Sequence, residues 1–184
     1  FGAFAPDIYR VPFSYPLRDA FGADGAAAAK AATDKIELLV GSANVAAIIA
    51  EPIQGEGGFI VPAEGFLSGL ADWAHAHDVL YISDEIQAGF CRSGKWFACE
   101  YDGVTPDLIT TAKALGGGMP IAAVTGRADI MDAVQPGGIG GIGDPPGDHA
   151  RLGEDRRDRF VEAGQERLLD RIEPLELRGI DDRG

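Results

Sequence analysis

One lysine and one carboxylate stand at the ends of two apolar stretches, where they could hold a reactive cofactor. Lys113 follows residues 107–111, and Asp84 follows residues 79–83. A lysine amine can form a Schiff base with the aldehyde of pyridoxal 5'-phosphate, and a carboxylate can keep the pyridine nitrogen of that cofactor protonated. Alone, the lysine is more simply a surface residue and the Asp a turn cap. Together they predict a pyridoxal-phosphate site.

Two other kinds of chemistry are weighed against this one. An acidic pair such as Asp84-Glu85 after an apolar strand also occurs in nucleotide hydrolases, where it binds a metal ion. That interpretation requires a Gly-x-x-x-x-Gly-Lys-Ser/Thr loop, which this sequence lacks. His75 and His77 fall in a predicted helix away from the strand ends, so we assign them to the surface. We therefore predict no metal site.

Strands and helices alternate in the part of the sequence that must position these residues. Continuous apolar runs predict buried strands, and apolar residues at helical spacing predict helices. The predicted strands are residues 45–50, 79–83, 107–111 and 121–125; the predicted helices are residues 26–40, 63–77 and one that begins at 129, after a loop-rich entry (1–23) with one short strand.

This alternation predicts the fold class: α/β, with a mostly parallel sheet and flanking helices. Ligands of such sheets bind beyond the carboxyl ends of the strands. Glu51, Asp84 and Lys113 each follow an apolar run directly or closely, so all three fall at that edge. The pattern alone therefore predicts that these three side chains lie near one another.

Composition excludes several classes of partner. The 184 residues carry a formal net charge of −13, which argues against nucleic acid and anionic membranes as partners. There is no apolar run of about 18 residues, as a membrane span requires, and the first residues do not resemble a signal peptide. Cys91 and Cys99 are the only cysteines, which favours reduced thiols and a cytoplasmic location.

The sequence changes character near its end. Residues 1–142 hold four Arg and four Lys, whereas residues 143–184 hold eight Arg, no Lys and twelve Asp or Glu. The junction at residues 142–148 is rich in Gly, Pro and Asp, which suits neither helix nor strand. We predict a partial cofactor-binding domain over residues 1–142 and a divergent tail over residues 143–184 that is disordered or the product of a frame shift.

The motifs of residues 1–141 resemble class III aminotransferases, which are pyridoxal-phosphate enzymes of the aspartate-aminotransferase fold (fold type I). The sequence of residues 51–58 and 136–141 is most similar to that of 4-aminobutyrate aminotransferases. The resembling segments are residues 4–6 with 9–10, 51–58 (EPIQGEGG), 82–90 (ISDEIQAGF), 92–94 (RSG), 106–108 (PDL), 112–113 (AK) and 124–127 (VTGR).

The resemblance implies a role for each residue of the cofactor site. Lys113 would bind the cofactor aldehyde and then carry a proton between substrate and cofactor. Asp84 would accept a hydrogen bond from the pyridinium nitrogen. Gln87 would bond the phenolic oxygen, and Ile86 would pack against the ring. Without the family, Ile86 is simply a core residue and Gln87 a loop residue.

Substrate contacts are implied for two further carboxylates. The residue matching Glu56 pairs in relatives with a C-terminal arginine that binds the α-carboxylate of glutamate, and Glu51 is expected near the substrate. Both are otherwise ordinary solvated loop carboxylates. Glycines 116–118 would let the backbone pass close to the cofactor, or form a plain flexible turn.

The sequence departs from the family after Gly141. The family has Thr-Tyr or Thr-Phe there, and that threonine reaches the cofactor phosphate of the partner subunit, whereas this chain has Ile142, which lacks a hydroxyl. The chain is also about half the expected subunit length or less. It therefore resembles the middle of a large domain, and a frame shift near this point is one explanation.

The first hypothesis is a transaminase that moves an amino group from 4-aminobutyrate, or a related omega-amino acid, to 2-oxoglutarate by a ping-pong mechanism. The family implies a homodimer in the full-length form, with a small-molecule amino donor and a keto acid as its ligands. A second hypothesis is a non-catalytic fragment that binds the cofactor weakly or not at all. A third keeps the cofactor and changes the reaction, as in aminomutase or decarboxylase relatives.

Overall fold

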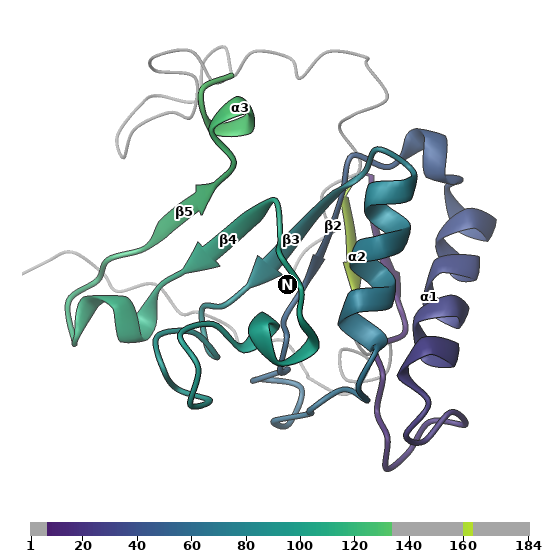
Figure 1. Ribbon diagram of the computed structural model, residues 1–184, viewed down its shortest axis with the longest axis horizontal. Coiled ribbons are helices and arrows are strands. Elements are labelled where there is room, and N and C mark those ends of the chain that lie inside the picture. The colour runs from purple at the N-terminus through teal and green to yellow at the C-terminus, as the bar shows by residue number, and fades with distance from the viewer. Residues whose placement is uncertain (1–6, 134–159, 164–184) are drawn as a thin grey trace, which may run out of the picture.

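The computed structural model describes residues 7–133 and 160–163, which form a six-stranded sheet with helices packed against it (Figure 1). The strands are β1 (Ile8–Val11), β2 (Ala47–Ala50), β3 (Leu80–Asp84), β4 (Leu108–Thr111), β5 (Ala123–Gly126) and β6 (Phe160–Ala163). The α-helices are α1 (Gly25–Leu39), α2 (Phe66–Ala76) and α3 (Ala128–Met131), and the 3-10 helices are η1 (Ser42–Asn44), η2 (Ala98–Asp102) and η3 (Lys113–Gly116).

The strand order is β1-β6-β2-β3-β4-β5. Every neighbouring pair from β1 to β4 is parallel, and β5 pairs antiparallel with β4 at the edge of the sheet. Parallel neighbours need a crossover connection, and α2 provides it between β2 and β3. Both of these strands are largely buried, as is typical of strands in a covered parallel sheet. The predicted α/β class with a mostly parallel sheet is confirmed.

The predicted helices and strands of residues 26–126 are all present, with ends that differ by no more than three residues. The short strand expected in the loop-rich entry is β1. Four residues of the tail 143–184 are described, and they form β6. The rest of the prediction for that tail, including the junction after Gly141, lies outside the described residues.

A distant carboxylate caps α2. Asp102, the last residue of η2, accepts hydrogen bonds from the backbone N–H groups of Gly65 (2.8 Å) and Ser68 (2.9 Å). A helix leaves its first N–H groups without internal partners, and a negative charge also suits the positive end of the helix dipole. Asp102 therefore stabilises α2 and at the same time ties η2 to it.

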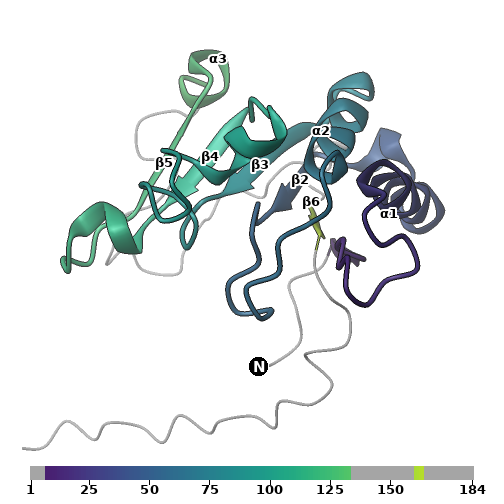
Figure 2. The ribbon, with the colours of Figure 1, turned by 60° about the horizontal axis from the view of Figure 1, so that its bottom comes forward.

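The helices α1 and α2 lie side by side on the same face of the sheet (Figure 2). Gly69 permits this close approach, because a Cβ there would lie 2.7 Å from the Cβ of Ala29. Ile36, Leu70 and Ile48 are fully buried in the core that the helices and the sheet share, and each contributes about 1.5–3 kcal/mol through burial. No helix among the described residues is both long and apolar enough to span a membrane.

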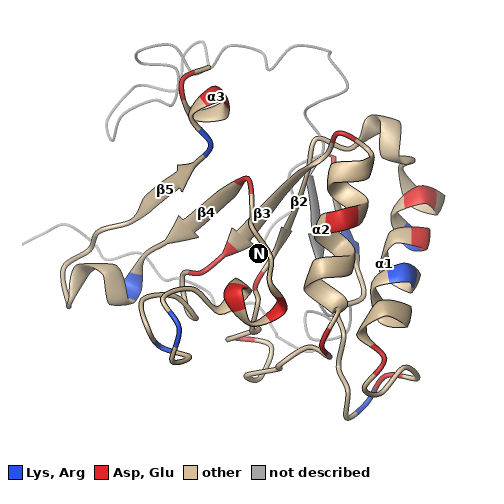
Figure 3. Cartoon of the chain, in the orientation of Figure 1, with Lys and Arg blue, Asp and Glu red and all other residues tan. Residues whose placement is uncertain are grey.

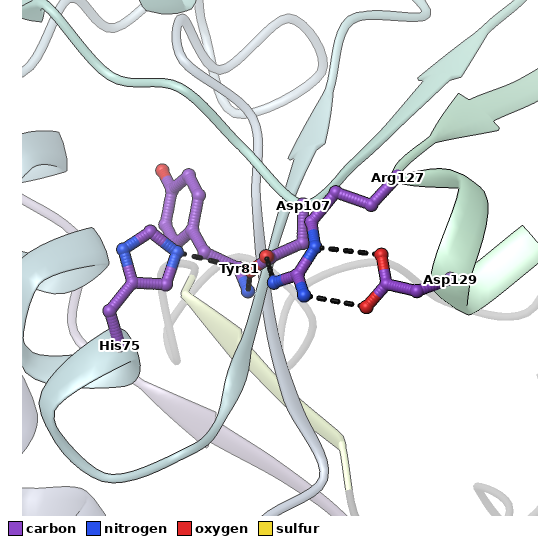
Figure 4. Close-up of polar contacts among 5 residues, drawn as sticks. All are labelled: His75, Tyr81, Asp107, Arg127 and Asp129. Atoms are coloured by element: carbon purple, nitrogen blue, oxygen red, sulfur yellow. Dashed lines mark hydrogen bonds and ion pairs between the residues drawn. The ribbon is translucent and has the colours of Figure 1, made fainter.

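The buried carboxylate of Asp107, directly before β4, joins several elements at the amino end of that strand (Figure 4). One oxygen accepts from the backbone N–H of Tyr81 (2.8 Å) and lies 3.1 Å from Nε2 of His75; the other accepts from Nη1 of Arg127 (2.8 Å). Arg127 also pairs with Asp129 at 2.6 Å. The prediction that His75 lies at the surface is confirmed, since 46% of its side chain is exposed, but its ring also contacts the buried Asp107.

Replacing Asp107 with Asn is expected to lower the free energy of unfolding by about 2 kcal/mol, because the amide cannot accept all three hydrogen bonds of a buried carboxylate. Asp72→Asn, on the exposed side of α2, is the matched control and should change the free energy by less than about 0.5 kcal/mol. Urea unfolding at neutral pH measures both. Equal effects of the two substitutions would contradict the role of Asp107.

The pH dependence gives a second check on Asp107. Burial alone would raise the pKa of this carboxyl, but the hydrogen bonds from Tyr81, Arg127 and His75 together hold the pKa below its ordinary value. A depressed folded pKa contributes stability that is complete above the unfolded value of about 3.9 and is lost as the pH falls through the lower folded value. The difference in stability between wild type and Asp107→Asn should therefore shrink in that acidic range.

Candidate active site

The carboxyl ends of β2, β3 and β4 bring three of the predicted residues to one edge of the sheet. Glu51 follows β2 directly, Asp84 is the last residue of β3, and Lys113 lies two residues after β4. These strands are parallel neighbours, so their ends share an edge. Figure 3 shows an acidic segment where β3 ends and a basic one where η3 begins. The predicted convergence is present in the fold.

Lys113 has an unusual backbone conformation. Its φ of 44° lies in the left-handed region, which costs a residue with a side chain about 1–3 kcal/mol. The chain turns sharply there, from β4 into η3, and Gly117 and Gly118 continue with φ values of 55° and 107° that glycine adopts readily. The Lys113 side chain is exposed, and its amine forms no hydrogen bond or ion pair with any described residue. Strain of this kind often marks a functional position.

Asp84 is half-buried and is held through one of its two carboxylate oxygens. Oδ1 accepts from the backbone N–H of Ile86 and from the hydroxyl of Thr110, both at 3.1 Å. The first of these bonds is the turn cap expected of an Asp at a strand end, so capping and cofactor binding are compatible roles. Oδ2 has no hydrogen-bond partner within the described part of the chain. That oxygen is available to an N–H donor.

The loop after Glu51 brings the two predicted substrate carboxylates near Gln87. Glu51 Oε2 accepts from the backbone N–H of Gly55 (2.8 Å), and Gln87 Nε2 donates to Glu56 Oε1 (2.8 Å). A Cβ at Gly55 would overlap the amide group of Gln87, so a larger residue there would move the Gln87 side chain. Glu51, Glu56 and Gln87 are therefore linked through Gly55, beyond the carboxyl ends of β2 and β3.

Glu85 is a site residue that the sequence interpretation passed over. Its carboxylate is 1% exposed and accepts from the backbone N–H groups of Ala98 (3.0 Å) and Cys99 (2.9 Å), at the start of η2. Asp84 is therefore followed directly by a residue that ties the end of β3 to η2. The acidic pair was visible in the sequence, but the partner of Glu85 lies 13 residues away in a loop, which no local pattern indicates.

The arrangement fits pyridoxal 5'-phosphate in two respects. A carboxylate with one open oxygen could accept from a protonated ring nitrogen, and an amine without a partner could bind an aldehyde. These groups stand on adjacent strand ends, Asp84 on β3 and Lys113 just beyond β4. No group of three or more metal-ligating side chains occurs within the described ranges.

Comparison with known proteins supports this picture. The family described as Aminotransferase class-III matches residues 1–145, which confirms the resemblance inferred from the motifs. The 4-aminobutyrate aminotransferase of Mycobacterium leprae is 50% identical over 196 aligned residues, which cover 100% of this chain and 44% of the relative. The leucine/methionine racemase of Thermococcus litoralis is 42% identical over 172 residues, covering 92% of this chain and 37% of the relative.

A solved structure gives the same result for the fold. The crystal structure of an (S)-enantioselective omega-transaminase from Thermomicrobium roseum superposes with a TM-score of 0.66 at 32% identity, covering 72% of this chain and 30% of that one. The chain therefore spans less than half the length of each of these three relatives.

The two thiols near the site are expected to differ in reactivity. Burial, and then the nearby Glu85 charge, raise the pKa of the Cys99 thiol to about 12, whereas Cys91 is exposed. A disulfide reagent such as DTNB should label Cys91 at least roughly 100-fold faster than Cys99 at pH 8. Stopped-flow absorbance of wild type and Cys91→Ser, which isolates Cys99, measures both rates.

The same assay tests the hold of Glu85 on η2. Glu85→Gln in the Cys91→Ser background should speed labelling of Cys99, because the amide offers one acceptor oxygen to the two N–H groups of η2. Asp72→Asn, the exposed position on α2 used above, serves as the control. If Cys99 in the Cys91→Ser protein, with Glu85 intact, were labelled as fast as Cys91 is in the wild type, the packing described for η2 would be wrong.

Proposed function

Since this chain belongs to the class III aminotransferase family, we propose that it provides the cofactor-binding core of a transaminase. The reaction moves an amino group from 4-aminobutyrate, or a related omega-amino acid, to 2-oxoglutarate. Class III aminotransferases depend on pyridoxal 5'-phosphate. The identity of 50% to a 4-aminobutyrate aminotransferase supports the choice of amino donor.

One observation carries the proposal: Asp84 and Lys113 occupy adjacent parallel strand ends, and Lys113 is held there in the left-handed conformation. Backbone strain at a residue with a side chain clusters at functional sites, which supports this role for Lys113. Asp84 also stands at the same end of the sheet as Lys113, and its Oδ2 has no hydrogen-bond partner among the described residues. The two features together support a cofactor site better than either does alone.

The residues of the site divide the work. When bound, the cofactor supplies an aldehyde and an electron-withdrawing ring. Lys113 Nζ would bind the aldehyde and, once the substrate amine takes its place, would accept and return a proton. Asp84 Oδ2 would hold the proton of the pyridine nitrogen in place. Gln87 would donate to the ring oxygen, and Ile86 would cover one ring face.

The substrate side of the site rests on Glu51 and Glu56. Glu51 stands at the end of β2 and holds the glycine-rich loop through Gly55. Glu56 accepts from Gln87, which leaves its second oxygen to face a basic group. Its proposed partner is an arginine that binds the substrate carboxylate in relatives of the 4-aminobutyrate type. A half-site of this kind selects amino acids that carry a carboxylate at a distance from the reacting amine.

A second reaction is also supported by a relative. The 42% identity to a leucine/methionine racemase means that the family tolerates a different outcome at the same kind of site. Formation of glutamate from 2-oxoglutarate and 4-aminobutyrate would support the transaminase. Inversion of L-leucine without glutamate formation would replace it by the racemase. Release of carbon dioxide, or migration of the amine, would favour the decarboxylase or aminomutase alternatives.

The remaining proposals concern setting and assembly. We infer a homodimer in the cytoplasm for the full-length protein. The dimer is inferred from the resemblance to class III aminotransferases. The cytoplasmic location is inferred from the two cysteines, Cys91 and Cys99, which are both free. A non-catalytic fragment is the alternative for the 184-residue chain by itself, because it spans 44% of a relative's length.

Reduction with borohydride tests the role of Lys113. The purified chain, incubated with pyridoxal 5'-phosphate and reduced, should carry one stoichiometric adduct, and peptide mass mapping should place that adduct on Lys113. Lys113→Ala should lose the adduct altogether. Lys30→Ala is the matched control, since Lys30 is an exposed lysine on α1 paired with Asp34, and it should leave labelling unchanged.

Two outcomes would overturn this assignment. An adduct that survives Lys113→Ala would place the reactive amine elsewhere. Labelling scattered over several lysines at substoichiometric levels would support the non-catalytic fragment instead. Either result is read from the masses of the peptides and does not depend on an activity assay.

A further inference from the structure

We propose that Thr110 is a positioning residue of the cofactor site: its hydroxyl orients the Asp84 carboxylate so that one oxygen faces the cofactor's ring nitrogen. The inference rests on the proposed function, because it assigns the target of Asp84. Neither the motifs of the sequence nor the named relatives single out Thr110.

The register of β3 against β4 brings Thr110 to Asp84. In the parallel pair of β3 and β4, Asp84 is the direct partner of Thr110. Their side chains consequently emerge on the same face, and the Thr110 hydroxyl donates to Asp84 Oδ1 at 3.1 Å. The backbone makes a second link, because the Thr110 carbonyl accepts from the N–H of Glu85 at 3.0 Å. Thr110 therefore holds the end of β3 at two points.

The two oxygens of the Asp84 carboxylate have different surroundings. Oδ1 of Asp84 takes two donors, the Ile86 N–H and the Thr110 hydroxyl, and Oδ2 takes none from the described residues. Two donors from different directions on one oxygen fix the rotation of the carboxylate about its χ angles. The position of Oδ2 is thereby set before any ligand arrives. Hydrogen bonds to an ionised carboxylate are also stronger than neutral ones.

Thr110 lies on the same strand that leads to Lys113. Thr110 lies three residues before Lys113, so one short segment orients the carboxylate and delivers the amine. The side chain of its neighbour Thr111 lies on the opposite face of the sheet, as successive residues of a strand do. The Thr111 hydroxyl donates to the carbonyl of Ala123 in β5 at 3.2 Å. Adjacent threonines on one strand thus serve different neighbours, and Thr111 provides a matched control.

The experiment measures the dissociation constant of pyridoxal 5'-phosphate for the purified chain, by titration of cofactor absorbance and tryptophan fluorescence. Thr110→Val keeps the shape of the side chain and removes the hydroxyl; it should weaken binding roughly tenfold. Thr110→Ser restores a hydroxyl and should return affinity to within about twofold of wild type. Thr111→Val also loses one hydroxyl bond and should bind like wild type.

A double-substitution cycle separates positioning from general damage. If Thr110 acts through Asp84, then Thr110→Val should add nothing in an Asp84→Asn background, since contacts that act as a unit are not additive. Thermal unfolding without cofactor is recorded for every variant. Should Thr110→Val not fold, Thr110→Ala takes its place in the same cycle.

The outcomes keep the inference and the proposed function apart. Wild type that labels on Lys113, together with Thr110→Val binding as tightly as Thr111→Val, would overturn the inference and leave the function standing. An additive loss in the Asp84→Asn background would overturn it as well. A wild-type chain that binds no cofactor would overturn the proposed function, and the inference with it.

Discussion

The carboxylate of Asp107 fixes where β4 begins, and the site at the other end of that strand depends on it. Three donors from α2, β3 and the end of β5 converge on this buried group. A strand of four residues has little room to slip once its first position is anchored, because a slip of one residue turns every side chain to the opposite face. The register of Asp84 against Thr110 follows from that anchor.

Charged side chains thus serve different purposes at the amino ends and at the carboxyl ends of the strands. At the amino ends of the strands, both oxygens of the Asp107 carboxylate are bonded, and the group holds three elements together. At the carboxyl edge, Asp84 keeps one oxygen open and Lys113 keeps its amine unpaired within the described residues. Buried Glu85 lies between these extremes: it uses its charge to bind η2, which in turn caps α2 through Asp102. Asp84, which has an oxygen available to a ligand, and Glu85, which holds η2 in place, are therefore consecutive residues.

The sequence predicted the strand ends well because apolar runs stop abruptly at polar residues, and Asp84 and Lys113 follow such runs. The same logic could not find Thr110 or the contacts of Asp107, since these depend on which strands are neighbours and in what register. Nothing in the apolar run of β5 distinguishes an antiparallel strand from a parallel one. The insertion of β6 between β1 and β2 was also out of reach, because strand order in space need not follow order in sequence.

That insertion has a consequence for synthesis on the ribosome. Of the described strands, β1 is made first, yet its partner in the sheet is β6, about 150 residues later, and at roughly 5–20 residues per second the wait is on the order of ten seconds. During that time β2, β3 and β4 can pair with one another, while β1 packs against α1. The nascent sheet therefore carries an open edge at β2 that a chaperone, or a neighbouring chain on the same polysome, could contact first.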